Sequence, residues 1–138
     1  MTTTGKKNMI FGVLYFLATL GLGMYLGSKY DLPGPELGKW LKSMEHTFLK
    51  IAHTHGNLEA LLNVVFGFLI SRFGQGSALS RISSVLFVTG AIFHSGMALL
   101  VGLGVAFAGK LMSVGAIALV LAMALMIPIL LKGVKKES

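Results

Sequence analysis

Four long runs of apolar residues, separated by short charged segments, dominate the pattern of this chain. Three of these runs carry no charged residue, and the run 51–71 carries only Glu59. Each run has about the 20 residues that a helix needs to cross a hydrocarbon core. Lipid offers no partners to backbone amides, so each run is expected to be helical. The pattern predicts one all-α integral membrane domain (1–138), a four-transmembrane-helix bundle with helices at roughly 8–28, 51–71, 82–108 and 111–131.

The connections between the runs differ in length and in character. The segment 29–50 is long and charged, and it contains Pro33-Gly34-Pro35. Its second half carries apolar side chains at helical spacing: Leu37, Trp40, Leu41, Met44 and Phe48. This spacing predicts a short amphipathic helix in the membrane interface between the first two spans, with Trp40 as its anchor. The other two connections, 74–77 and Gly109-Lys110, are expected to be tight turns.

Composition supports a membrane protein and excludes several other classes. Hydrophobic residues make up 54% of the chain and charged residues only 12%. Soluble domains carry about 25% charged residues, so this chain has about half the charge that a water-facing surface needs. A soluble enzyme, a disordered tail and a nucleic-acid-binding domain are therefore excluded. The chain has no cysteine, which also excludes disulfides, thiolate metal sites and iron–sulfur clusters.

Lysine and arginine are unevenly divided between the two sides of the predicted bundle. The side of the termini holds seven of them: Lys6, Lys7, Arg72, Arg81, Lys132, Lys135 and Lys136. The other side holds five: Lys29, Lys39, Lys42, Lys50 and Lys110. Positive charge is retained on the cytoplasmic side, so both termini are expected to be cytoplasmic, in a prokaryotic inner membrane.

Small residues inside the runs predict close packing of the helices. Gly23 and Gly27 form a GxxxG pair, and Ala118 and Ala122 are four residues apart. Small residues let helix backbones approach where no hydrophobic effect drives association. We expect a compact bundle in the lipid bilayer that assembles as a homo-oligomer.

Polar and ionisable residues concentrate in the second and third runs, where they are costly. The second run contains His53, His55, Glu59 and Asn63, and the third contains His94. A charged side chain near the bilayer centre costs roughly 2.5–3.5 kcal/mol on insertion scales, which makes this set a candidate functional site. At 100° per residue, His55, Glu59 and Asn63 share one stripe, whereas His53 is about 160–200° from His55. The two histidines are therefore expected to point to different sides.

The residues alone leave three interpretations of this set open. A neutral imidazole could bind haem iron while a carboxylate or amide orients its second nitrogen. His55, Glu59 and His94 could instead hold a divalent metal ion. The polar groups could also only hydrogen-bond across helices. Tyr15 and Thr19, four apart in the first run, could add a hydroxyl to the same pocket.

Two stretches of the chain resemble styrene oxide isomerase: GVLYFLATLGLG at 12–23 and Ala52-His53 at the start of the second run. That family is a trimeric four-helix membrane bundle that binds haem b through a histidine near the start of its second helix. Its iron is a Lewis acid that converts an epoxide to an aldehyde. The resemblance implies that His53 is the axial ligand. The third run lacks the Asp and the Tyr that the family has near its substrate.

These observations together lead to one expected function. We expect an integral membrane haem b protein, trimeric by resemblance, that acts on a small apolar substrate, a gas or an electron. The candidate catalytic residues are Glu59 and Asn63. The candidate cofactor-binding residues are His53, His55 and His94, with His53 and His55 as the candidate ligands of the iron. The alternatives are a non-catalytic helical subunit of a larger membrane complex and a His/Glu divalent-metal site.

Overall fold

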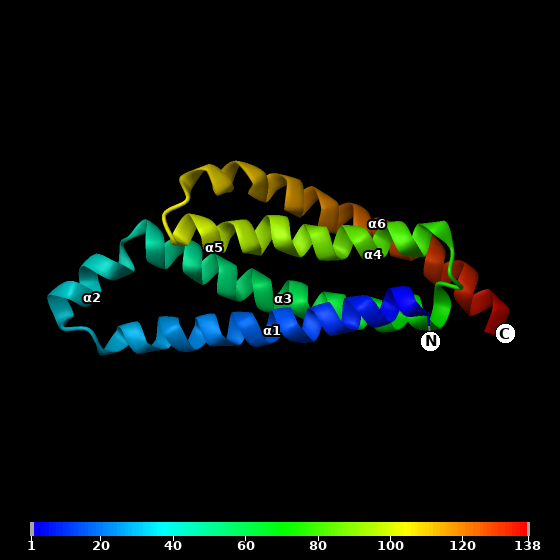
Figure 1. Cartoon of the computed structure of the whole chain (residues 1–138), viewed down its shortest axis with the longest axis horizontal. Coiled ribbons are helices and arrows are strands. Elements are labelled where there is room, and N and C mark those ends of the chain that lie inside the picture. Colours follow the sequence, from blue (N-terminus) through cyan, green and yellow to red (C-terminus); the bar gives the residue numbers. More distant parts are fainter. Residues whose placement is uncertain (1, 138) are drawn as a thin grey trace.

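The four apolar runs form four long helical spans in the computed structural model, which describes residues 2–137 (Figure 1). Three spans are single helices: α1 (Thr3–Ser28), α3 (Met44–Phe73) and α6 (Met112–Glu137). The third span in chain order consists of α4 (Ala78–Ala91), the π-helical turn Ile92–Gly96 and α5 (Met97–Gly102). All four are long and apolar enough to cross a membrane. The predicted four-helix fold is confirmed, and by these helices the chain is an integral membrane protein.

Short helices connect the spans at the end of the bundle opposite the two termini (Figure 1). A 3₁₀ turn (Lys29–Asp31) and α2 (Gly34–Leu41) lead from α1 to α3. The prediction of one interfacial helix running on to Phe48 is wrong. Its second half belongs to α3, because Ser43 interrupts the segment and accepts a hydrogen bond from the His46 N–H at 3.1 Å. Trp40 is buried against Leu26 and Leu49.

The third connection also differs from the expectation. The third span ends at Gly102 and not at residue 108, and Gly109 and Lys110 lie in a 3₁₀ helix (Ala106–Leu111). The chain reverses at 103–105, where Gly104 has a φ of 97°. This left-handed conformation is accessible to glycine without steric cost. Lys110 marks the end of the apolar run in the sequence, but Gly104 provides the turn.

The helices pack as α1 along α3 and α4 along α6, and several glycines make these approaches close. A Cβ at Gly12 would lie 2.6 Å from the carbonyl oxygen of Ala60, so α1 and α3 meet here through their backbones. The two glycines of the predicted GxxxG pair, Gly23 and Gly27, do not form a joint site of close helix packing within this chain. Gly23 faces the His53 ring, and a Cβ at Gly27 would meet nothing within 4 Å. Gly27 is therefore not part of a helix contact within this chain.

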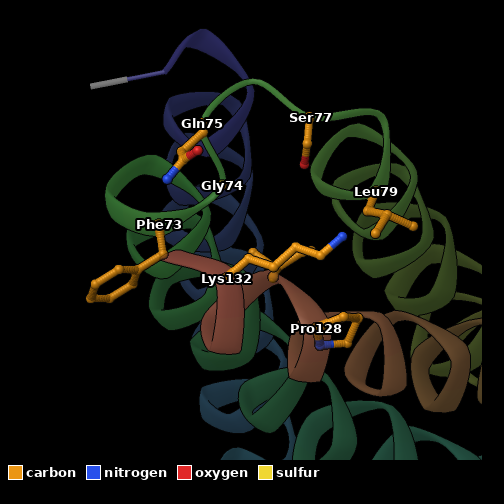
Figure 2. Close-up of a pocket in the computed structure, with 8 residues that line it drawn as sticks. Phe73, Gly74, Gln75, Ser77, Leu79, Pro128 and Lys132 are labelled. Carbon is orange, nitrogen blue, oxygen red and sulfur yellow. The ribbon is translucent and has the colours of Figure 1, made fainter. Parts of the chain in front are cut away.

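A small cavity lies at the end of the bundle that carries the termini, where the 74–77 turn meets α6 (Figure 2). Its volume is about 90 Å³, and its wall includes Phe73, Pro128 and Lys132. Among the residues that the structure describes, Lys132 is the only ionisable one in this wall. The cavity is therefore a packing feature of the turn. The candidate site residues lie deeper in the bundle.

Candidate functional site

Glu59 lies halfway along α3 and points into the bundle toward the third span. It is only 2% exposed. Its Oε1 atom is 2.5 Å from Nδ1 of His94, and its Oε2 atom accepts a hydrogen bond from the hydroxyl of Ser95. Each carboxylate oxygen thus has its own partner. Glu59, the one acidic residue within the predicted spans, is thus held by two adjacent residues of one helical turn.

That turn is the π-helical segment Ile92–Gly96, which contains both His94 and Ser95. A π turn is a local widening of an α-helix and is frequently found at functional sites. Here it directs two neighbouring side chains to the same carboxylate. The turn is also packed tightly from behind, because a Cβ at Gly115 of α6 would collide with the His94 backbone nitrogen. Nothing in the apolar pattern of the third run indicates this turn.

His55 lies one helical turn before Glu59 and faces His94. The two imidazole rings are 4.9 Å apart between centroids and nearly perpendicular, at 89°. One ligand atom from each of His55, Glu59 and His94 lies within 4.8 Å of the other two. His55 is exposed, whereas the His94 side chain is 18% exposed. The cluster is therefore closed around the carboxylate and open on the side of His55.

Tyr15 of α1 continues the polar network on the other side of Ser95. Its hydroxyl is 2.8 Å from the Ser95 Oγ and also donates to the Ala91 carbonyl oxygen at 3.2 Å. Ser95 is 1% exposed. Gly56 lets α1 come close to α3 beside this network, since a Cβ there would be 2.5 Å from Cγ2 of Thr19. Tyr15, Ser95, Glu59 and His94 form one continuous hydrogen-bonded chain across three spans. The sequence indicated Tyr15, but not Ser95 as the link.

His53 lies on the other side of α3, against α1. Its Nδ1 atom is 2.8 Å from the carbonyl oxygen of Thr19. The ring also fills the space over Gly23, where a Cβ would be 3.0 Å from Nε2. His53 and His55 thus point to different sides, as helix geometry predicted. The structure brings His55 into the cluster with Glu59 and leaves His53 outside it.

Asn63 is fully buried and joins three spans. Its amide nitrogen donates to the carbonyl oxygens of Glu59 (3.0 Å) and Phe87 (3.2 Å). Its Oδ1 accepts a hydrogen bond from Asn8 at 3.0 Å, and Asn8 also bonds Ser84. Every polar atom of this side chain is engaged in holding α1, α3 and α4 together. Although Asn63 is on the stripe of Glu59, it contacts the Glu59 backbone and not the carboxylate.

A small cavity adjoins Ala52, the residue before His53. This cavity between α1, α3 and the third span holds about 60 Å³. Sites for drug-sized ligands occupy about 300–1,000 Å³. This cavity by itself is therefore too small for a porphyrin, and His53 is not among its lining residues. His55, in contrast, is exposed on the outer side of the cluster.

No family model, curated protein or solved structure matches this chain. The chemistry of the clustered side chains is thus the guide to function. Two imidazoles and one carboxylate are the donor set of divalent zinc and non-haem iron(II) sites that keep an open coordination position. The cluster His55, Glu59 and His94 has this composition.

Proposed function

We propose that this chain is a membrane metal protein that binds a divalent transition-metal ion, zinc(II) or iron(II), through His55, Glu59 and His94. It acts there on a small apolar molecule delivered by the bilayer. The observation that carries the proposal is the convergence of these three donor groups within 4.8 Å of one another, halfway along α3. Ionisable residues inside membrane spans are costly, so a set of three that meet is best explained by function.

The spacing of the three donors suits such an ion after a small adjustment. Ligand atoms around a tetrahedral ion at 2.0–2.2 Å lie about 3.4 Å apart. His94 Nδ1 and Glu59 Oε1, at 2.5 Å, would separate slightly, and His55 would close in. The proton shared by His94 and Glu59 would leave on binding, since metal ligands must be deprotonated.

Two further residues would hold the carboxylate ligand in place. Ser95 binds Oε2 of Glu59, which leaves Oε1 for the contact with His94. Tyr15 in turn fixes Ser95 through a 2.8 Å hydrogen bond. Such outer partners orient a ligand and typically contribute 10–100-fold to metal affinity. The exposed side of His55 leaves an approach for a fourth ligand from the bilayer.

Metal titration of the detergent-purified protein tests this function. Wild type should bind zinc(II) or iron(II) with one ion per chain. His55→Ala and Glu59→Gln should each weaken binding by about 100-fold or more, because each removes a ligand, a larger change than loss of an outer partner. His53→Ala is the matched control and should bind as wild type does. Absence of stoichiometric binding to wild type, or an equal loss in His53→Ala, would refute the proposal.

Haem b bound through His55 is the second candidate. The exposure of His55 supports it, since a porphyrin could occupy the open side of the cluster, where a second copy of the chain in a homo-oligomer would cover it. Haem would supply Lewis-acid or electron-transfer chemistry. A Soret band that is lost in His55→Ala and kept in His53→Ala would favour this candidate. Metal binding without a Soret band would favour the His/Glu site.

We also propose that both termini face the cytoplasm of a prokaryotic inner membrane. Both termini lie at one end of the bundle and α2 at the other (Figure 1), and the end with the termini carries more lysine and arginine. A reporter enzyme fused after Ser138 should be active only in the cytoplasm. The same reporter inserted within 31–38 should be active only on the outer side. The reverse pattern would contradict this orientation.

A further inference from the structure

We propose that the small cavity beside Tyr15 and Ser95 is a binding site for an uncharged apolar molecule of two or three heavy atoms, such as a dissolved diatomic gas. This inference rests on the proposed metal site, because it names the class of molecule that would be held next to it. The cavity lies between α1, α3 and the third span and is lined by Tyr15, Ala18, Thr19, Leu22, Ala52, Ser95 and Leu99.

The size of the cavity selects small guests. Its volume is about 60 Å³. A water molecule needs about 10–15 Å³ of such space, and a cavity that accommodates a benzene ring has about 150 Å³. The volume of the cavity is larger than one water molecule needs and less than half of the volume that an aromatic ring needs. It therefore suits a guest of two or three heavy atoms and excludes lipid chains and haem.

The chemistry of the wall favours an apolar guest over water. Ala18, Leu22, Ala52 and Leu99 supply most of the wall. The polar side chains of the wall already have partners: Ser95 donates to Glu59, Tyr15 donates to the Ala91 carbonyl oxygen, and the Thr19 hydroxyl bonds the Asn57 side chain. A buried water requires two to four hydrogen-bond partners. An uncharged apolar molecule needs no hydrogen-bond partner, so it loses no hydrogen bond when it enters the cavity.

The position of the cavity connects the bilayer with the metal-ligand cluster. Ala18 in its wall is on the exposed side of α1, so the cavity borders the hydrocarbon phase, in which apolar gases are favourably dissolved. At its inner end, the Ser95 hydroxyl is one hydrogen bond from the Glu59 carboxylate. The cavity is thus a holding position beside the cluster, and Tyr15 and Ser95 separate the guest from Glu59.

Xenon is a suitable probe, because its binding needs no metal and is read directly by xenon NMR. Metal-stripped wild type in detergent should show one saturable xenon site. Ala52→Val and Leu99→Phe, which add volume from two different helices, should each weaken xenon binding at least tenfold. Ala124→Val is the matched control on the exposed side of α6 and should bind as wild type does.

The outcomes separate this inference from the proposed function. Absence of a saturable xenon site in wild type would overturn the inference, even if the metal titration succeeds. Unchanged xenon binding in both filled variants, with folding verified by circular dichroism, would also overturn it, because the xenon would then lie elsewhere. Wild type could bind xenon, and the filled variants lose it, while the metal titration fails. The cavity would then stand as a binding site, and the proposed metal site would be refuted.

Discussion

The His94→Leu variant should be less stable than wild type by about 3–5 kcal/mol, the usual cost of removing one partner from a buried ionic pair. Glu59 is 2% exposed and loses its 2.5 Å contact with His94 in this variant. The remaining hydrogen bond from Ser95 satisfies only one of its oxygens. The free energy of unfolding in bicelles, measured by steric trapping, checks this value.

The double variant Glu59→Leu/His94→Leu should recover most of that loss. Replacing both members of a buried pair by apolar residues is often neutral or stabilising, because no unpaired group stays behind. His46→Leu is the control, since His46 is at the start of α3, outside the cluster, and should cost about 1 kcal/mol for its hydrogen bond. A double variant as unstable as His94→Leu would show that the loss in His94→Leu does not come from leaving the Glu59 carboxylate unpaired.

The Gly115→Ala variant should lose about 3 kcal/mol of stability and disturb the His94 position at the same time. An added Cβ at Gly115 would collide with backbone atoms of Phe93 and His94 and lie 2.7 Å from the Gly90 carbonyl oxygen. Backbone cannot rotate away as a side chain can, so α6 must move off the π turn. Steric trapping gives the stability, and metal titration should show weaker binding.

Gly27→Ala is the matched control for this glycine substitution. A Cβ at Gly27 meets nothing within 4 Å, although the residue is also in a spanning helix. Alanine has the higher helix propensity, by about 1 kcal/mol, so this variant should be as stable as wild type or more stable. Equal stability of Gly115→Ala and Gly27→Ala would mean that the contact between α6 and the π turn is loose.

The spans could be predicted from the sequence because each depends only on one continuous run of residues. A run of about 20 uncharged residues can only cross a bilayer as a helix, whatever surrounds it. The ends of the elements needed more. Ser43 divides the interfacial segment by capping α3, and Gly104 provides a turn that the apolar pattern of the third run conceals.

The candidate site was predictable in its members but not in its grouping. Glu59, His55 and His94 stood out because ionisable groups are rare in membrane spans. His53 and His55 could be predicted to point to different sides of the helix, because successive residues are rotated by 100° around a helix axis. Helix geometry did not indicate which histidine would meet α1 and which would meet the third span. That choice places His55, and not His53, in the cluster with Glu59 and His94.

The sequence by itself determined the four spans and the stripe on α3 that carries His55 and Glu59, since both depend on spacing within one continuous helix. Only the tertiary structure decided that α1 covers His53, that Asn63 is engaged by Asn8, and that Ser95 links Tyr15 to the carboxylate. These are contacts between residues 34 to 80 positions apart. They depend on how helices pack, and on a π turn held by the glycine of another helix, which no local pattern encodes.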